Sequence, residues 1–318
     1  MRNDLHLSPW TISHSGPGWA DEFCESIFFL GNGRMGVRGY VSSEPACRPI
    51  QKGLYLAGIF GEIKPGITDF VNLPTPVRET VLIDNLEAEL VSDIERTLDL
   101  RQALLTMRYT LSANGKNLQI EHQRFLPKEQ PALILQRMTL IPDTDMMVTI
   151  ASGILTDSCN SPIPDDQTKA NTETIQLSQP TGISVSDTGI SCTFAIRGTS
   201  LTVTQEVQFS CPDFSRTNSS GACCVYRVSA ASGQKLSFDK IAGILTSRDV
   251  DPRIAGIPTD WQYDTLLAAH KAAWANTWKI CDMDISAYGE DLQTGLRYAM
   301  FQLLGSCSAK DPTVSIGA

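Results

Sequence analysis

The chain has 318 residues, of which 42% are hydrophobic and 19% charged, values typical of a soluble globular protein and not of a disordered or fibrous one. Its formal net charge of -9, with no dense run of Lys and Arg, argues against nucleic acid as a partner because phosphate backbones are repelled. The length suits one large β domain or two ordinary domains.

The cysteines and the N-terminus indicate where the protein works. The nine cysteines are an odd number at irregular spacings with no C-x-x-C pair, so we expect free thiols and a reducing compartment. Residues 2–11, RNDLHLSPWT, lack the apolar core of a signal peptide, and no apolar run reaches the roughly 18 residues that a membrane helix needs. We therefore expect a cytoplasmic protein without a membrane partner.

From about residue 25 to residue 248, short alternating runs are separated by turn residues, a pattern typical of an all-β sandwich or barrel. The clearest case is 104–125, where apolar residues alternate on both sides of Asn114-Gly115, a pair that supplies the positive φ of a tight turn. This segment predicts a β-hairpin. Further strands are predicted at 131–141, 174–178, 189–198, 200–210 and 223–230, and a long exposed loop at 157–173.

After Pro258 the hydrophobic period changes from two to between three and four, which predicts two helices at the end of the chain. The first has an apolar stripe of Tyr263, Leu267, His270, Trp274, Trp278 and Cys281. The second has a stripe of Leu292, Leu296, Met300, Leu303, Leu304 and Cys307, with Glu290 and Asp291 placed to favour its N-terminus. Part of each stripe is expected to pack against the sandwich.

The stretch LGNGRMGVRG (30–39) has the glycine spacing of a dinucleotide fingerprint, G-x-G-x-x-G. The fingerprint needs a helix after the third glycine, but VRGYVSSEPACRPI follows Gly36 and contains a glycine, β-branched residues and two prolines. We therefore interpret Gly31, Gly33 and Gly36, with Asn32, as positive-φ positions of a turn between strands. Arg38 is expected to anchor the turn to a carboxylate such as Glu25.

The same stretch, extended to ESIFFLGNGRMGVRG (25–39), resembles a signature of glycoside hydrolase family 65, the maltose, trehalose and kojibiose phosphorylases and some hydrolases. The family-motif positions are Glu25, Gly31, Asn32, Gly33, Gly36, Arg38 and Gly39. Further similar segments follow in family order: FVNLP (70–74), ERTLDLRQALLTMRY (95–109), HQRFLPKEQPAL (122–133), KIAGILTSRD (240–249), AAWANTWKICDMDI (272–285), DLQTGLRYAMFQLL (291–304) and SIGA (315–318).

The resemblance implies a mainly β fold, a large antiparallel β-sandwich of the galactose mutarotase-like super-sandwich kind followed by two C-terminal helices. It implies an N-terminal β-sandwich domain at 1–256 and a helical linker at 257–318 that leads to an (α/α)6 catalytic barrel, which this sequence lacks. The expected partner is that catalytic domain, and the family also implies homodimer formation. No catalytic residue, cofactor or metal ligand is carried over, and we expect the chain to be inactive alone.

The remaining residue types give weaker indications of chemistry. Glycoside transfer needs a carboxylic acid, but Glu25, Asp69, Asp99, Glu121 and Asp145 are candidates by residue type only. Asp143-x-Asp145 and Asp165-Asp166 lack the glycine and closing glutamate of a calcium loop and are interpreted as turns.

Two side chains are candidates for contact with a sugar. His122 lies on a predicted strand and could face a concave sheet, although a single strand histidine is more often packed or hydrogen-bonded. Trp19 offers a stacking face. A second hypothesis therefore remains open, in which the chain is a stand-alone carbohydrate-binding module. In a third, the catalytic half is a separate chain that covers the apolar faces of the two helices.

Overall fold

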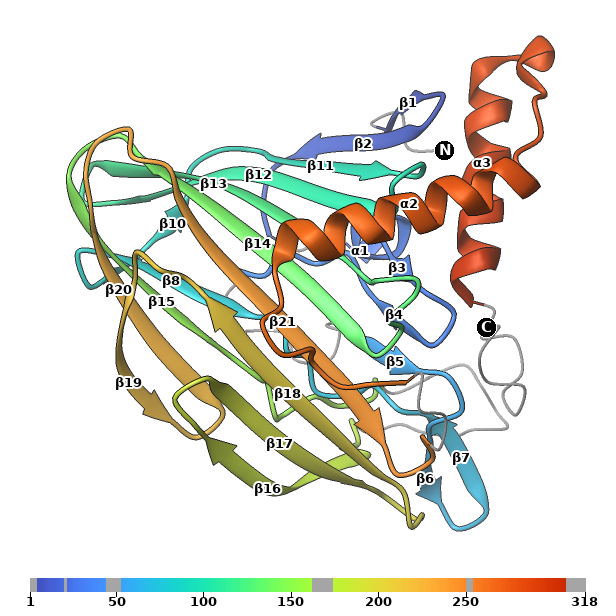
Figure 1. Cartoon of the computed structure of the whole chain (residues 1–318), viewed down its shortest axis with the longest axis horizontal. Coiled ribbons are helices and arrows are strands. Elements are labelled where there is room, and N and C mark those ends of the chain that lie inside the picture. The colour runs from blue at the N-terminus through green and yellow to red at the C-terminus, as the bar shows by residue number, and fades with distance from the viewer. Residues whose placement is uncertain (1–4, 20–21, 44–52, 162–173, 250–253, 307–318) are drawn as a thin grey trace.

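The computed structural model of the chain describes residues 5–19, 22–43, 53–161, 174–249 and 254–306. Two β-sheets form most of the molecule, and helices follow them at its C-terminal side (Figure 1). The larger sheet has eleven strands in the order β1-β2-β11-β12-β13-β14-β21-β18-β17-β16, with β10 paired to β12. The smaller has five, in the order β19-β20-β15-β8-β9. The predicted mainly antiparallel β fold with C-terminal helices is confirmed.

The strands of the larger sheet are β1 (Leu5–Ser8), β2 (Thr11–Gly16), β10 (Glu89–Leu90), β11 (Ile94–Asp99), β12 (Leu104–Ala113), β13 (Lys116–Phe125), β14 (Leu133–Pro142), β16 (Ser178–Val185), β17 (Gly189–Ile196), β18 (Thr202–Ser210) and β21 (Leu236–Thr246). Those of the smaller sheet are β8 (Glu79–Ile83), β9 (Leu86–Glu87), β15 (Met146–Gly153), β19 (Ser215–Ser220) and β20 (Cys223–Ala230). Two small sheets flank them, β3 (Leu30–Gly31) with β4 (Met35–Val37) and β5 (Leu54–Leu56), and β6 (Phe60–Lys64) with β7 (Ile67–Phe70).

Local sequence rules account for the best-defined strands. The predicted hairpin is confirmed as β12 and β13, and Asn114 and Gly115 have φ values of 50° and 77° at its turn. The strand predicted at 174–178 is displaced along the chain, because β16 begins only at Ser178. This edge strand is exposed along nearly its whole length, so its sequence lacks the alternation of apolar and polar residues from which a strand can be predicted. Most of the loop predicted at 157–173 lies outside the described residues.

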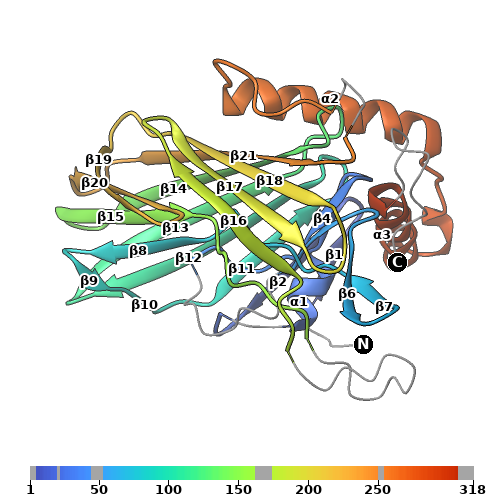
Figure 2. The same cartoon turned by 90° about the horizontal axis from the view of Figure 1, so that it is seen from below.

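The α-helices of the described residues are α1 (Glu22–Ile27), α2 (Tyr263–Cys281) and α3 (Glu290–Ser306), with a short 3-10 helix, η1 (Ser286–Tyr288), between the last two. The short α1 was not predicted. Figure 2 shows α2 lying along the larger sheet, close to β21. Its predicted stripe is confirmed, since Tyr263, His270, Trp274 and Trp278 are buried. None of the described helices is long and apolar enough to cross a membrane.

Strand alternation explains how the larger sheet is packed on both faces. Leu133 and Leu135 of β14 contact the cluster that includes Tyr263 of α2, whereas Ile134 and Met138 belong to the main core. The side chains around Tyr263 therefore form a second layer apart from the main core, whereas Trp274 and Trp278, farther along α2, belong to the main core itself. Both layers are apolar and buried, which fixes the start of the helical segment against the sheet.

The buried face of α3 differs from the predicted stripe. Met300 and Leu304 pack against the core as expected, but Leu292 and Leu303 are 59% and 61% exposed. Cys307, the last residue of the predicted stripe, lies outside the described residues. The residues that α3 buries are Gln293, Thr294, Arg297, Phe301 and Gly305.

Polar partners on the first strands explain this orientation. Thr294 donates its hydroxyl to the carbonyl of Ser8 at 2.8 Å, and Arg297 donates to the carbonyl of Pro9 at 2.7 Å. Arg297 also forms an ion pair with Asp282 at 2.9 Å and lies over the ring of Trp10. These bonds hold the polar side of α3 inward and leave part of its apolar side outward.

Candidate functional site at the glycine hairpin

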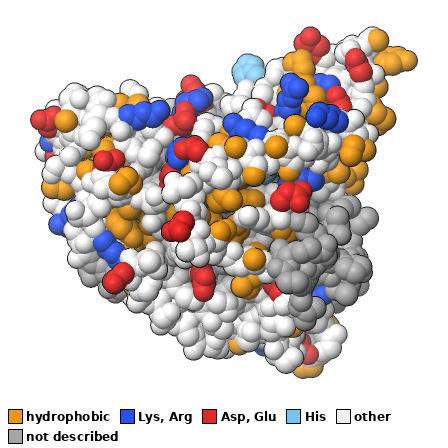
Figure 3. Space-filling model, viewed as in Figure 1, with side chains coloured by type: hydrophobic (Ala, Val, Ile, Leu, Met, Phe, Trp, Pro, Cys, Tyr) orange, Lys and Arg blue, Asp and Glu red, His pale blue; other side chains and the backbone are white. Residues whose placement is uncertain are grey.

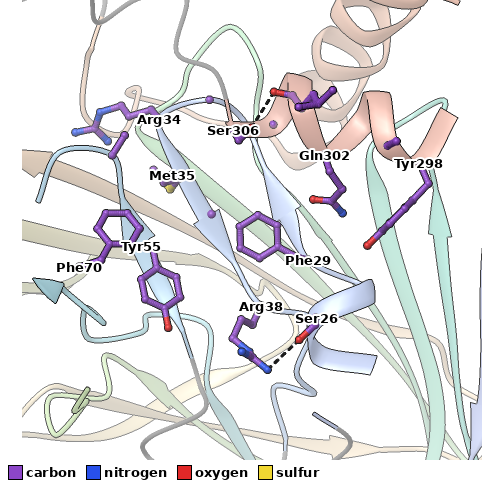
Figure 4. Close-up of a pocket in the computed structure, with 16 residues that line it drawn as sticks. Ser26, Phe29, Arg34, Met35, Arg38, Tyr55, Phe70, Tyr298, Gln302 and Ser306 are labelled. Carbon is purple, nitrogen blue, oxygen red and sulfur yellow. Dashed lines mark hydrogen bonds between the residues drawn. The ribbon is translucent and has the colours of Figure 1, made fainter. Parts of the chain in front are cut away.

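A groove of about 610 Å³ lies beside the glycine stretch, between β4 and α3 (Figure 4). One wall contains Tyr55 and Phe70, and the other contains Tyr298, Gln302 and further residues of α3. Figure 4 shows Arg34 and Ser306 toward one end of the groove and Arg38 and Ser26 toward the other. The volume lies within the roughly 300–1,000 Å³ of small-molecule sites.

The glycine stretch forms the predicted turn between strands. β3 and β4 pair antiparallel, and Gly33 between them has a φ of 88°. Gly31, Gly36 and Asn32 have no positive φ, contrary to expectation. The Asn32 side chain closes the turn instead, because Oδ1 accepts hydrogen bonds from the amides of Arg34 at 3.2 Å and Met35 at 3.0 Å. No helix follows Gly36 in the described residues that come next, so a dinucleotide fold is excluded there.

Side chains of this turn connect segments that are far apart in the sequence. Asn32 donates from Nδ2 to the carbonyls of Pro127 and Pro131, each at 3.2 Å. Arg34 donates to the carbonyl of Ile244 at 2.9 Å and pairs with Asp249 at 2.6 Å. Three of the sequence segments singled out above, 25–39, 122–133 and 240–249, therefore meet at this hairpin.

Glycines allow α3 to approach the hairpin closely. The amide of Gly33 donates to the carbonyl of Gly305 at 2.7 Å. A Cβ atom added at Gly31 would lie 2.7 Å from that same carbonyl oxygen, closer than real Cβ contacts. At Gly36 a Cβ atom would overlap the ring of Phe29. Packing against the backbone of α3 thus requires glycine at position 31, whereas a Cβ atom at position 36 would displace the Phe29 ring, and the hairpin positions the C-terminal turn of α3.

The predicted pairing of Arg38 with Glu25 is present, with Nε of Arg38 3.2 Å from Oε2 of Glu25. Glu25 is 3% exposed and lies on α1. Gly39, the last motif position, donates its amide to the carbonyl of Glu25 at 2.8 Å. Burial raises the pKa of Tyr55 above its ordinary value, although the nearby Arg38 acts in the opposite direction.

His122 lies far inside the sandwich rather than in the groove. It is 1% exposed, and its Nε2 is 3.2 Å from both Oε2 of Glu79 and Nε2 of Gln136. Lys240 lies on the other side of Glu79, at 3.4 Å, and donates to Ser152 at 2.7 Å. Burial lowers the pKa of His122, and Lys240 and His122 together lower that of Glu79 despite its own burial. The cluster joins the two sheets.

Trp19 also lies away from the groove. It is half-buried and packs edge-on against the ring of Tyr109, with ring centroids 5.7 Å apart. The structure brings the motif residues together, but it does not bring His122 or Trp19 to them. Aromatic residues that sequence reasoning missed, Phe29, Tyr55 and Phe70, line the groove instead. No spacing pattern marks them, because they come from three separate elements.

The groove has no acid or base in a position for glycoside transfer. None of its described lining residues is Asp or Glu. Within the described ranges, no three His, Cys, Asp or Glu residues gather to hold a metal ion. The chemistry available in the groove is therefore aromatic stacking and hydrogen bonding from guanidinium, amide and hydroxyl groups.

Comparison with known proteins identifies the family. Residues 21–277 match the model of the glycosyl hydrolase family 65 N-terminal domain. The chain belongs to family 65. An uncharacterised glycosyl hydrolase of Mycobacterium tuberculosis is 26% identical over 98% of this chain and 25% of its own length. A kojibiose phosphorylase of Caldanaerobacter subterraneus subsp. tengcongensis is 24% identical over 92% of this chain and 41% of its own length.

A solved structure supports the same fold. A putative kojibiose phosphorylase from the human microbiome superposes with a TM-score of 0.78 at 16% identity, covering 99% of this chain and 44% of that one. This family 65 chain thus spans less than half the length of each of these relatives. The helices α2 and α3 fall within the superposed part, as the high coverage of this chain requires.

Proposed function

We propose that this chain is the noncatalytic N-terminal domain of a family 65 glycoside hydrolase or disaccharide phosphorylase and that it supports a catalytic (α/α)6 barrel. The β-sandwich at 1–256 would be the supporting body, and the segment at 257–318 the linker. Membership of the family and the greater length of the relatives both support this role. The absence of carboxylates from the described groove lining agrees with it, since glycoside transfer requires them.

The observation that carries the proposal is an outer stripe on α3, formed by Leu292, Leu296, Ala299 and Leu303. These residues are four, three and four positions apart and so share one face of the helix. Leu292 and Leu303 are each about three-fifths exposed, at 59% and 61%. A helix face with such exposed apolar side chains is typical of a surface that another protein covers.

The connection between the helices extends this surface. Ile280, Met283 and Tyr288 are 89%, 54% and 78% exposed. In Figure 3, hydrophobic side chains are visible at the upper right, where Figure 1 places the turn between α2 and α3. By contrast, the side of α3 that faces the sandwich is already covered, by the hydrogen bonds of Thr294 and Arg297 and by the burial of Phe301 in the core, so among the described residues the outer stripe is the apolar side left to α3 for a partner. We assign this side to the catalytic barrel.

Two further parts of the proposal concern assembly and location. Homodimer formation rests on the family resemblance and predicts a dimer by light scattering once the barrel is joined. A cytoplasmic location is supported by the cysteines, because all seven in the described residues are free thiols.

To test the proposal, the coding sequence after residue 318 is first read for a barrel domain. That barrel is then produced separately, and its binding to the chain is measured. The double variant Leu292→Ser/Leu296→Ser, at two stripe residues outside the groove lining, should weaken binding at least about tenfold, since central apolar contacts dominate such interfaces. The matched control is Leu86→Ser on β9, which is 48% exposed but lies on the smaller sheet. Equal binding by the stripe variant and the control would contradict the proposal.

A further inference from the structure

The groove beside the glycine hairpin has a role that support of a barrel does not require. We propose that it binds a neutral saccharide, with a sugar ring stacked on the aromatic wall formed by Tyr55 and Phe70. The inference rests on the chemistry of the groove itself and goes beyond the proposed supporting function. It also places the saccharide away from His122 and Trp19.

The aromatic wall is built for stacking. Tyr55 and Phe70 lie with ring centroids 5.3 Å apart and planes inclined by only 16°, and Phe60 continues the row at 5.3 Å from Phe70. Tyr55 and Phe70 remain partly exposed in the groove. A pyranose ring presents an apolar face of C–H groups, and an open aromatic surface stacks favourably against such a face.

Polar groups stand near this wall with bonding capacity to spare. Nε and Nη2 of Arg38 contact Glu25, Ser26 and the carbonyl of Glu22, whereas Nη1 has no hydrogen bond to any described residue. The Tyr55 hydroxyl likewise has none within the described part of the chain. Near opposite ends of the groove, the hydroxyls of Ser26 and Ser306 donate to the carbonyls of Glu22 at 2.9 Å and Leu303 at 3.0 Å, and each oxygen can accept a further hydrogen bond (Figure 4). These donors and acceptors suit the hydroxyl groups around a sugar ring.

The charge balance of the groove favours a neutral ligand over an anion. Both arginines that line it are already paired, Arg34 with Asp249 at 2.6 Å and Arg38 with Glu25 at 3.2 Å. Each pair cancels its own charge, so a phosphate would gain little attraction there. A charge-assisted hydrogen bond from Nη1 to a neutral hydroxyl remains available without breaking either pair.

Saturation-transfer NMR and calorimetry on the intact chain test the proposal with glucose, maltose, trehalose, kojibiose and nigerose as probes. We expect binding with a Kd on the order of 1 mM to at least one of them. Malto-oligosaccharides in the same assay show whether the groove binds a free disaccharide or the end of a longer saccharide chain. Silence from every probe at up to about 10 mM would overturn the proposal.

Three variants locate the site. Tyr55→Ala should weaken binding about tenfold, because it removes the stacking ring. Ser26→Phe, at an exposed position of α1 that lines the groove and lies outside the outer stripe of α3, should do the same by filling one end of the groove, and it leaves the core untouched. Tyr288→Ala is the control, because Tyr288 is 78% exposed and lies outside the groove lining.

Unchanged saccharide binding by Ser26→Phe, or an equal loss in the Tyr288→Ala control, would overturn the assignment to this groove. The result is distinguishable from failure of the supporting role. Tyr55 and Ser26 lie outside the outer stripe, so loss of saccharide binding in their variants should leave barrel binding intact, whereas equal barrel binding by the stripe variant and its control contradicts only the supporting function.

Discussion

Replacing Gly31 by Ala should detach the end of α3 from the glycine hairpin. The new Cβ atom would lie 2.7 Å from the carbonyl oxygen of Gly305 and 3.1 Å from its carbonyl carbon. Both are backbone atoms, so no flexible side chain can move aside. The helix must shift outward, which also breaks the 2.7 Å hydrogen bond from Gly33 to Gly305.

The size of the effect follows from these two terms. Overpacking of this kind costs about 1–3 kcal/mol, and the lost hydrogen bond about 1 kcal/mol. The unfolding free energy should therefore fall by about 2–4 kcal/mol, measured by urea denaturation followed by tryptophan fluorescence. Hydrogen exchange measured by mass spectrometry should quicken in the last turns of α3 before it changes in the sheets.

Gly295→Ala is the matched control within the same helix. An added Cβ atom there has no other heavy atom within 4 Å, and Gly295 is exposed. Because alanine favours a helix over glycine, this variant should gain up to about 1 kcal/mol. If Gly31→Ala proved as harmless as Gly295→Ala, or if α3 kept its exchange protection, the reasoning about the glycine hairpin would be refuted.

Three more outcomes are expected from the described contacts. Asn32→Ala removes two acceptor and two donor bonds and should lower the unfolding free energy by about 2–3 kcal/mol; an unchanged urea midpoint would show that the turn closes without it. His270 is 2% exposed, and burial lowers its pKa to about 4. In the unfolded chain this histidine has its ordinary pKa of about 6.5, so on acidification it gains a proton at a higher pH than the buried histidine does. The free energy of unfolding should therefore fall as the pH drops from about 6.5 to about 4, by about 3 kcal/mol in total. His270→Gln should remove this part of the pH dependence, and identical curves for both proteins would count against it. Lys240→Met leaves the charge of Glu79 buried and should cost about 3–5 kcal/mol, whereas Lys240→Met/Glu79→Gln should recover part of the loss, as thermal unfolding can test.

The sequence was most informative where local rules act alone. The turn at Asn114-Gly115 needs positive φ at two successive residues, so its hairpin could be predicted without knowledge of the rest. The same holds for the ion pair of Arg38 with Glu25, which joins residues of one short segment. The helix α2 was also predictable, because its buried side is almost wholly apolar.

Prediction from sequence was weaker where hydrogen bonds to distant backbone groups determine which side of a helix is buried. In α3 the polar residues Thr294 and Arg297 face inward because they bind carbonyls of Ser8 and Pro9, almost three hundred positions earlier. Periodicity finds the apolar stripe but not which part of it another element covers. The aromatic wall of the groove could not be predicted for a similar reason, since Tyr55 and Phe70 come from two separate small sheets and meet only in the folded chain.

The most direct measurement of the central claim is the activity of the purified 318-residue chain with phosphate and each of maltose, trehalose, kojibiose and nigerose. The account predicts that neither glucose nor glucose 1-phosphate is released, because the described groove has no carboxylate to serve as the acid. Reproducible release of either product, abolished by a single substitution within this chain, would contradict the assignment as a noncatalytic N-terminal domain.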